Sequence, residues 1–155
     1  MAHIANKTLL LLSILLISCQ SPQKTIPDSA FVEVKIFLNK DTSDCSTVEA
    51  VTKTIPKMEK IEAQTLSELF KELSFPENTL RGFHIVDRKA YVDLVDISSI
   101  VPNSSCSSAA LLAEMDATIK QFGSIDEILY ATNGSSEDFY EWLQMQAPES
   151  FPDKF

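Results

Sequence analysis

Three aspartates near a predicted hairpin are the side chains of this sequence best suited to acid–base chemistry: Asp87, Asp93 and Asp96. Two carboxylates about 5 to 9 Å apart can hydrolyse a glycosidic bond, one as the acid and the other as base or nucleophile. Asp93 alternates with apolar neighbours, so we expect its side chain to point to solvent or to a second layer. A structural or solubilising role is the simpler interpretation, and a carbohydrate-binding or hydrolase role is the alternative.

Other reactive side chains are few. The sequence shows no serine or cysteine motif that would pair with His84 for nucleophilic catalysis, and no G-x-S-x-G motif is present. The aspartates lack EF-hand spacing, and no C-x-x-C pair is present to suggest a metal site. Only three glycines occur, which excludes the usual phosphate-binding loop. We therefore predict no catalytic residue, no metal and no cofactor.

The N-terminus has the pattern of a targeting segment. Lys7 precedes an apolar run of about ten residues, the length of a signal peptide rather than of a membrane span. The run ends in Leu16-Ile17-Ser18-Cys19, which resembles the lipobox of bacterial lipoproteins. This resemblance implies cleavage after residue 18 and lipidation of Cys19, which anchors the chain to the extracytoplasmic face of a bacterial membrane, facing the periplasm or the cell surface. An ordinary secretory signal is the alternative.

Two cysteines remain after such processing, Cys45 and Cys106. In an oxidising compartment an even pair is expected to form a disulfide, here closing a loop of about 60 residues. Two buried free thiols are the alternative. Residues 20–30 are polar and contain two prolines, so with Cys19 they are predicted to form a flexible tether.

The composition excludes several partners. Lys plus Arg total 13 against 22 for Asp plus Glu, giving a net charge of -9. Nucleic-acid binding and a polybasic membrane patch both need clustered cations, so neither is expected. The 45% hydrophobic and 23% charged content is that of a globular protein.

Hydrophobic periodicity predicts one α+β domain over residues 31–146, followed by a frayed tail at 147–155. The expected order is β-β-α-β-β-α-β, with helices packed on a small mixed sheet, plus a short C-terminal helix. The predicted elements are strands at 31–38 and 48–55, a helix from 65 to 73, a hairpin over 80–95, a helix from 107 to 122, a strand at 125–132 and a helix from 136.

Local signals predict where several elements begin and end. Thr65 and Glu68 form a capping-box pattern at the start of the first helix. Gly123 is placed to end the second helix, and Ser136 to cap the last. Arg88 does not suit a two-residue turn, which favours glycine or asparagine, so a longer hairpin loop is expected.

The last predicted helix gathers four large apolar side chains: Phe139, Tyr140, Trp142 and Leu143. The simpler interpretation is that this helix docks on its own domain. The alternative is a partner-binding anchor, because exposed aromatic side chains dominate many interfaces.

The succession of segments resembles the GerMN domain, a sporulation and spore-germination module of bacterial lipoproteins. The resemblance covers roughly residues 31–135. The paired placement of Cys45, before an I-P-K run, and Cys106, before the long helix, is its most specific feature. The other matching segments are the strand from Val32, the helix with Leu66-Ser67-Glu68-Leu69-Phe70, the strand Lys89-Ala90-Tyr91-Val92-Asp93-Leu94, the run Ile119–Ile125 and the closing Asn133-Gly134.

This resemblance implies a compact α/β fold related to ring-building modules of sporulation complexes. It also implies a noncatalytic role in protein–protein or envelope interaction. The expected partners are the membrane, through Cys19, and an unidentified envelope protein or cell-wall component.

Overall fold

The structure of the chain is a computed structural model that describes residues 30–41 and 44–148. The predicted signal peptide, most of the tether and Cys19 lie outside the described residues, as does the tail from 149 onward. Ala147 packs against the core, so the domain extends at least one residue into the segment predicted as a tail.

The observed elements follow the predicted order, which confirms the α+β class. They are β1 (Phe31–Asn39), β2 (Val48–Pro56), α1 (Ile61–Glu72), β3 (Leu80–Val86), β4 (Lys89–Leu94), α2 (Ser105–Lys120), β5 (Glu127–Thr132) and α3 (Ser136–Trp142).

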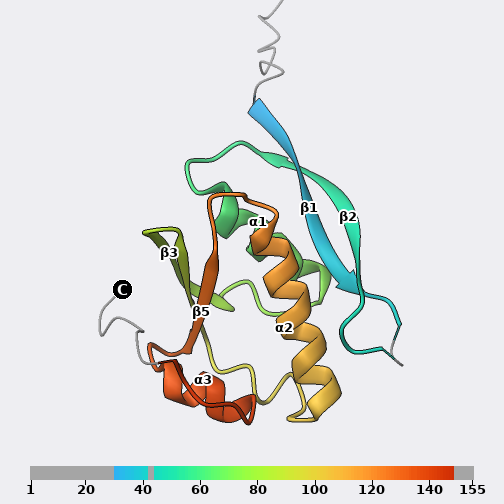
Figure 1. Cartoon of the computed structure of the whole chain (residues 1–155). Coiled ribbons are helices and arrows are strands. Elements are labelled where there is room, and N and C mark those ends of the chain that lie inside the picture. Colours follow the sequence, from blue (N-terminus) through green and yellow to red (C-terminus); the bar gives the residue numbers. More distant parts are fainter. Residues whose placement is uncertain (1–29, 42–43, 149–155) are drawn as a thin grey trace, which may run out of the picture.

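The strands form two sheets where one was expected. β1 and β2 pair antiparallel as a two-stranded sheet, and the second sheet has the order β3-β4-β5. Within the second sheet β3 and β4 are antiparallel, whereas β4 and β5 are parallel and connected through α2. Figure 1 shows α2 lying between β5 and β1, so this helix joins the two sheets.

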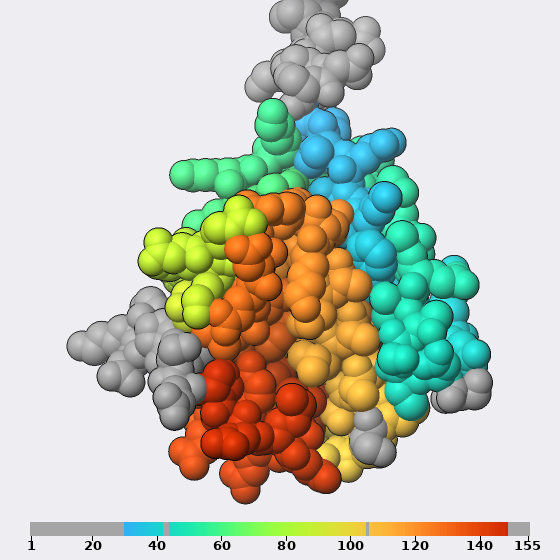
Figure 2. Space-filling model, viewed as in Figure 1, coloured from blue at the N-terminus to red at the C-terminus, as the bar shows by residue number. Residues whose placement is uncertain are grey.

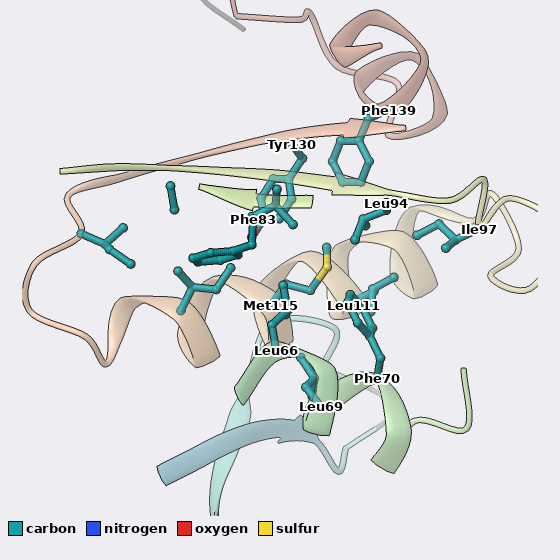
Figure 3. Close-up of a cluster of buried hydrophobic side chains, with 14 of the residues drawn as sticks. Leu66, Leu69, Phe70, Phe83, Leu94, Ile97, Leu111, Met115, Tyr130 and Phe139 are labelled. Atoms are coloured by element: carbon teal, nitrogen blue, oxygen red, sulfur yellow. The ribbon is translucent and has the colours of Figure 1, made fainter. Parts of the chain in front are cut away.

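The core lies between the three-stranded sheet and the helices, as Figure 3 shows. Alternating residues of β4 and the i, i+3, i+4 stripe of α1 point into it, because apolar burial is the main stabilising contribution in such a domain. Its fully buried members include Ile36, Leu66, Leu69, Val92, Leu94, Met115, Ile119 and Phe139.

The first helix begins earlier than its predicted cap. It starts at Ile61, and Thr65 lies inside it, buried, with its hydroxyl donating to the Ile61 carbonyl at 2.7 Å. The capping-box prediction at Thr65 is therefore wrong. The same sequence pattern also suits a threonine inside a helix whose hydroxyl donates to the carbonyl four residues earlier. The residues before Thr65 decide whether it caps the helix or lies within it.

The hairpin turn is shorter than expected. β3 and β4 are joined by the two residues Asp87 and Arg88, both with positive φ, at 49° and 63°. This is the backbone of a type I′ turn. The Arg88 guanidinium offsets the strain by binding the Asp126 carboxylate through two nitrogens, at 2.5 and 2.6 Å. A distant partner thus makes a poor turn residue acceptable.

Two other helix boundaries also differ from prediction. α2 begins at Ser105 behind the cap residue Ser104, and its end is formed by Gln121 in right-handed conformation, not by Gly123. The cap of α3 is Ser135, whose hydroxyl accepts the Asp138 N–H at 3.1 Å, one residue before the predicted Ser136.

Candidate functional site

A disulfide between Cys45 and Cys106 joins the β1–β2 loop to the first turn of α2. Their Cα atoms are 5.1 Å apart, and 61 residues separate them in the chain. This confirms the predicted pairing. The bond holds the end of the β1–β2 hairpin against the element that connects the two sheets.

The loop that carries Cys45 is ordered by its neighbour Asp44. The Asp44 carboxylate accepts the Ser46 N–H at 2.9 Å and the hydroxyls of Ser46 and Thr47. The Asp44 carbonyl accepts the Asn39 side-chain amide at 2.7 Å. Donation by Thr47 and Ser46 lowers the pKa of Asp44 to about 2, so the carboxylate that accepts these hydrogen bonds is charged at physiological pH.

The edge of β1 that does not pair with β2 is hydrogen-bonded by side chains of α2 and of its C-terminal cap residue. The backbone N–H of Lys35 donates to Gln121, that of Phe37 to Thr118 and that of Asn39 to Glu114, at 2.9, 3.0 and 2.7 Å. We call Glu114 and Thr118 of α2, together with Gln121 at its C-terminal cap, the edge ladder. These three residues occupy positions i, i+4 and i+7, which lie on one helix face. They can therefore bind every second residue along the strand β1. The N–H groups of the three β1 residues on this strand edge therefore find their hydrogen-bond acceptors within the domain, and not in solvent or a partner.

Glu114 of the edge ladder is a carboxylate with only 6% of its surface exposed. Its burial raises its pKa, against the opposing effect of the Asn39 N–H. The side chain therefore carries a desolvation cost that a neutral acceptor of the same shape would avoid.

Asp93 is buried, so of the two expected orientations, towards solvent or towards a second layer, the first is wrong. Its carboxylate accepts the Gly134 N–H at 2.8 Å and lies 3.4 Å from the Arg81 guanidinium. Arg81 also donates to the Asn133 side chain at 3.2 Å. Asn133 and Gly134 form the turn after β5, with φ of 52° and 86°. Asp93 therefore fastens this turn to β4, a structural role.

The other two hairpin carboxylates lie apart. Asp87 is in the β3–β4 turn and Asp96 follows the far end of β4, so the length of the strand separates them. A six-residue strand is about 16–20 Å long, well beyond the carboxylate spacing of a glycosidase. Asp96 is exposed and accepts the Ser98 N–H at 2.9 Å. Hydrogen bonding by the Ser98 side chain, and then by its N–H, lowers the pKa of Asp96.

Asp96 borders an open groove of about 420 Å³ beside α3. Three carboxylates, two asparagines and one indole line it, and neither Asp138 nor Glu141 has an ion-pair partner among residues 30–41 and 44–148. Its polar and aromatic lining residues are Asp96, Ser98, Asn103, Thr132, Asn133, Asp138, Glu141 and Trp142.

Of the four large apolar residues predicted for the last helix, two belong to the domain's own core. Phe139 is fully buried and stacks on Tyr130 at 5.0 Å between ring centroids, and Tyr140 is 9% exposed. Trp142 and Leu143 are partly exposed and pack against the core. Figure 3 shows Tyr130 and Phe139 side by side at the sheet. Within this set, only Trp142 and Leu143 leave surface for a partner.

Tyr130 links this aromatic cluster to α2. Its hydroxyl donates to Asp116 at 2.8 Å, and burial beside that carboxylate raises the tyrosine pKa well above its usual value. The contact places α2 against β5, as the edge ladder places it against β1.

The described residues offer no assembled metal site. Nowhere in residues 30–41 or 44–148 do three His, Cys, Asp or Glu side chains gather to hold a metal ion. No helix within the same ranges is long and apolar enough to cross a membrane.

Comparison with known proteins gives one informative match. No protein-family model matches the sequence, and no curated protein matches it. Among solved structures, the first GerMN domain of the sporulation protein GerM from Bacillus subtilis superposes with a TM-score of 0.51. The match covers 67% of this chain and 84% of the other, at 20% sequence identity. The chain has a GerMN-like fold.

The GerMN-like fold confirms the family resemblance stated from the sequence at the level of architecture. At 20% sequence identity the match shows the fold alone. The segments that carried the resemblance have structural roles here: the V-D-L strand supplies Asp93, which holds the turn at Asn133-Gly134, and the two cysteines form the disulfide.

The edge ladder is the feature of this GerMN-like fold that sequence reasoning missed. Glu114, Thr118 and Gln121 are polar and share one face of a predicted helix, and two of them, Glu114 and Thr118, are buried next to buried apolar residues. The signal in the sequence is a stripe of polar residues beside the apolar stripe of the same helix. Because buried polar side chains need hydrogen-bond partners, such a stripe indicates contact with backbone groups of another element.

Proposed function

We propose that the chain is a lipid-anchored, extracytoplasmic GerMN-like module that binds another protein or envelope component and performs no catalysis. The observation that carries this proposal is the Cys45–Cys106 disulfide within a GerMN-like fold. Structural disulfides persist in oxidising compartments, which supports export of the domain. Export in turn agrees with the signal-peptide pattern and with lipidation at Cys19.

A noncatalytic role is supported by what the hairpin carboxylates do. Asp93 is used to hold a turn, Asp96 orders its own loop, and Asp87 lies at the other end of β4. Paired carboxylates for hydrolysis would have to face each other across one cleft. The named structural neighbour is a sporulation protein, and participation of this chain in sporulation or germination is part of the proposal.

The proposal is tested by locating the chain and its contacts in cells. Membranes are separated from soluble fractions for the wild type and for Cys19→Ala, and intact cells are treated with a protein crosslinker. We expect the wild type in the membrane fraction, accessible to external protease after removal of the cell wall, and crosslinked to an envelope component. Cys19→Ala should leave the membrane. A protease-protected cytoplasmic chain without crosslinks would contradict the proposal.

A second candidate function is glycan binding at the groove beside α3. The observation that favours it is the lining of the groove, where the partly exposed Trp142 lies near Asn103 and Asp96. Aromatic faces and polar oxygens are common in polar small-molecule sites. Titration of the chain with cell-wall glycan fragments, followed by Trp142 fluorescence, tests this candidate. A saturable change that Asn103→Ala, at another lining residue of the groove, weakens would support it, and no change would contradict it.

A further inference from the structure

The two edges of the β1–β2 hairpin are arranged differently. On the β1 edge, the outward N–H groups of Lys35 and Phe37 are bound by the edge ladder of α2. In an antiparallel pair, directly opposed residues either both bond across the pair or both point outward. Lys35 lies opposite Thr52, and Phe37 lies opposite Ala50. The backbone groups of Thr52 and Ala50 therefore point away from β1, along the outer edge of β2.

This outer edge of β2 is bare. Ala50, Thr52 and Thr54 are exposed, and across residues 30–41 and 44–148 no group hydrogen-bonds to their outward N–H and C=O groups. Figure 1 shows β2 on the side of β1 away from α2, at the rim of the molecule. In Figure 2 the same hairpin lies along the margin of the surface, beside α2. Unpaired edges of this kind readily accept another strand.

The second sheet has two further outer strands, β5 and β3. β5 has six residues, three of them buried, and β3 is also less suited to pairing than β2. Strand β3 is seven residues long, and its register shifts between Leu80 and Gly82, with the charged Arg81 at the irregularity. Bulges and charges are the usual means by which proteins block edge pairing. β2 has nine residues in continuous register with β1, and its proline, Pro56, stands at the end.

The charges of β2 are self-complementary about Val51. Glu49 precedes this residue by two positions and Lys53 follows it by two, so all three lie on one face of the strand. If two β2 strands meet antiparallel with Val51 opposite Val51, each Glu49 lies opposite a Lys53. In the same register Ala50 lies opposite Thr52, and the outward backbone groups of both strands meet as hydrogen-bonding pairs.

We propose that two copies of this chain associate through their β2 strands, antiparallel about a two-fold axis at Val51, to form a four-stranded sheet. The opposed Glu49–Lys53 pairs select a second copy as the occupant over an arbitrary strand, since charge complementarity sets register and partner. One strand pair buries little surface, so the dimer is weak and concentration-dependent. This inference goes beyond the proposed function, because it holds whether or not Cys19 is lipidated.

The backbone test uses Thr52→Pro with Thr52→Val as its matched control. Proline removes the outward N–H of residue 52, which does not bond to β1, so the hairpin keeps its own ladder. Valine keeps the N–H and the β-branched shape. In sedimentation of the detergent-extracted chain over a wide concentration range, we expect the wild type and Thr52→Val to dimerise. Thr52→Pro should remain monomeric and retain cooperative unfolding.

The charge test exchanges Glu49 and Lys53. Glu49→Lys or Lys53→Glu alone places like charges opposite each other at both symmetric positions, and should weaken dimerisation about tenfold. The double variant restores opposite charges across the interface and should recover wild-type association. Within one chain, Glu49 pairs with Lys40 and Lys53 with Glu72, at 3.1 and 2.5 Å. The double variant does not restore these pairs, so recovery is specific to the interface.

Three results would overturn the inference. They are a wild-type chain that stays monomeric at every concentration, a well-folded Thr52→Pro that dimerises like the wild type, or a double charge variant no better than the single ones. If Thr52→Pro fails to unfold cooperatively, the charge series decides. Membrane fractionation of the same variants keeps this outcome separate from that of lipid anchoring.

Discussion

Individual polar side chains, rather than the apolar core alone, hold the parts of this domain in place. Asp93 fastens the turn after β5, Arg88 ties the β3–β4 turn to Asp126, and Glu114 binds the end of β1. Each links residues far apart in the chain. Such contacts explain why residues that look like candidates for chemistry in the sequence serve structure instead.

Replacing Asp93 by alanine should strongly destabilise the domain. The change leaves the Gly134 N–H without its acceptor and Arg81 without its partner, and should lower the free energy of unfolding by about 2–3 kcal/mol. Asp87→Asn, at an exposed turn position where asparagine suits the positive φ, should change it by less than about 0.5 kcal/mol. Urea unfolding of both variants measures this, and equal effects would refute the structural role of Asp93.

Replacing Glu114 by glutamine should change how stability depends on pH. Burial raises the pKa of Glu114 above its ordinary value of 4.5, so the folded wild type binds this proton more tightly than the unfolded chain. Its stability contribution is therefore lost as pH rises from below 4.5 through the raised value. Glutamine keeps an oxygen to accept the Asn39 N–H and does not titrate. Thermal unfolding at several pH values should show the variant gaining on the wild type as pH rises; a constant difference would contradict this.

At the scale of elements, α2 is the centre of the fold. It contacts β1 through the edge ladder, β5 through Asp116 and Tyr130, and the β1–β2 loop through Cys106. Two small sheets that share no strand pairing can therefore act as one domain.

Helix α3 should prove to be anchored mainly by Phe139. Truncation of this fully buried ring to alanine should cost about 3–5 kcal/mol of unfolding free energy. Trp142→Ala, at a partly exposed position, should cost clearly less and leave the fold intact. Chemical denaturation of the two variants makes the comparison. A larger loss for Trp142 would show that the indole is core and would remove the surface left for a partner.

Periodicity predicted the elements well, because the alternation in β1 and the stripe of α1 directly reflect which faces are buried. Boundaries and local turns were less predictable. Thr65 matched a cap pattern but lies inside a helix, and Arg88 adopts positive φ because Asp126, distant in sequence, compensates. The burial of Asp93 likewise depends on a turn 41 residues away. Long-range partners of this kind leave no local pattern.

For the molecule as a whole, we expect the disulfide to contribute strongly to the stability of the domain. It closes a separation of 61 residues and connects the hairpin to α2. Reduction should lower the free energy of unfolding by about 2–5 kcal/mol, chiefly by freeing the unfolded chain. Urea unfolding with and without a thiol reductant measures the loss, with Cys45→Ser plus Cys106→Ser as the control that reductant should not affect. A reduced protein as stable as the oxidised one would contradict the expected role.

We propose that an exported, lipid-anchored chain carries this disulfide-linked GerMN-like domain. The most direct measurement is the intact mass of the membrane-extracted protein, with and without reduction, after thiol alkylation. We expect a mass for residues 19–155 plus acyl groups, with two thiols alkylated only after reduction. A full-length chain without lipid, with three thiols that react before reduction, would contradict it.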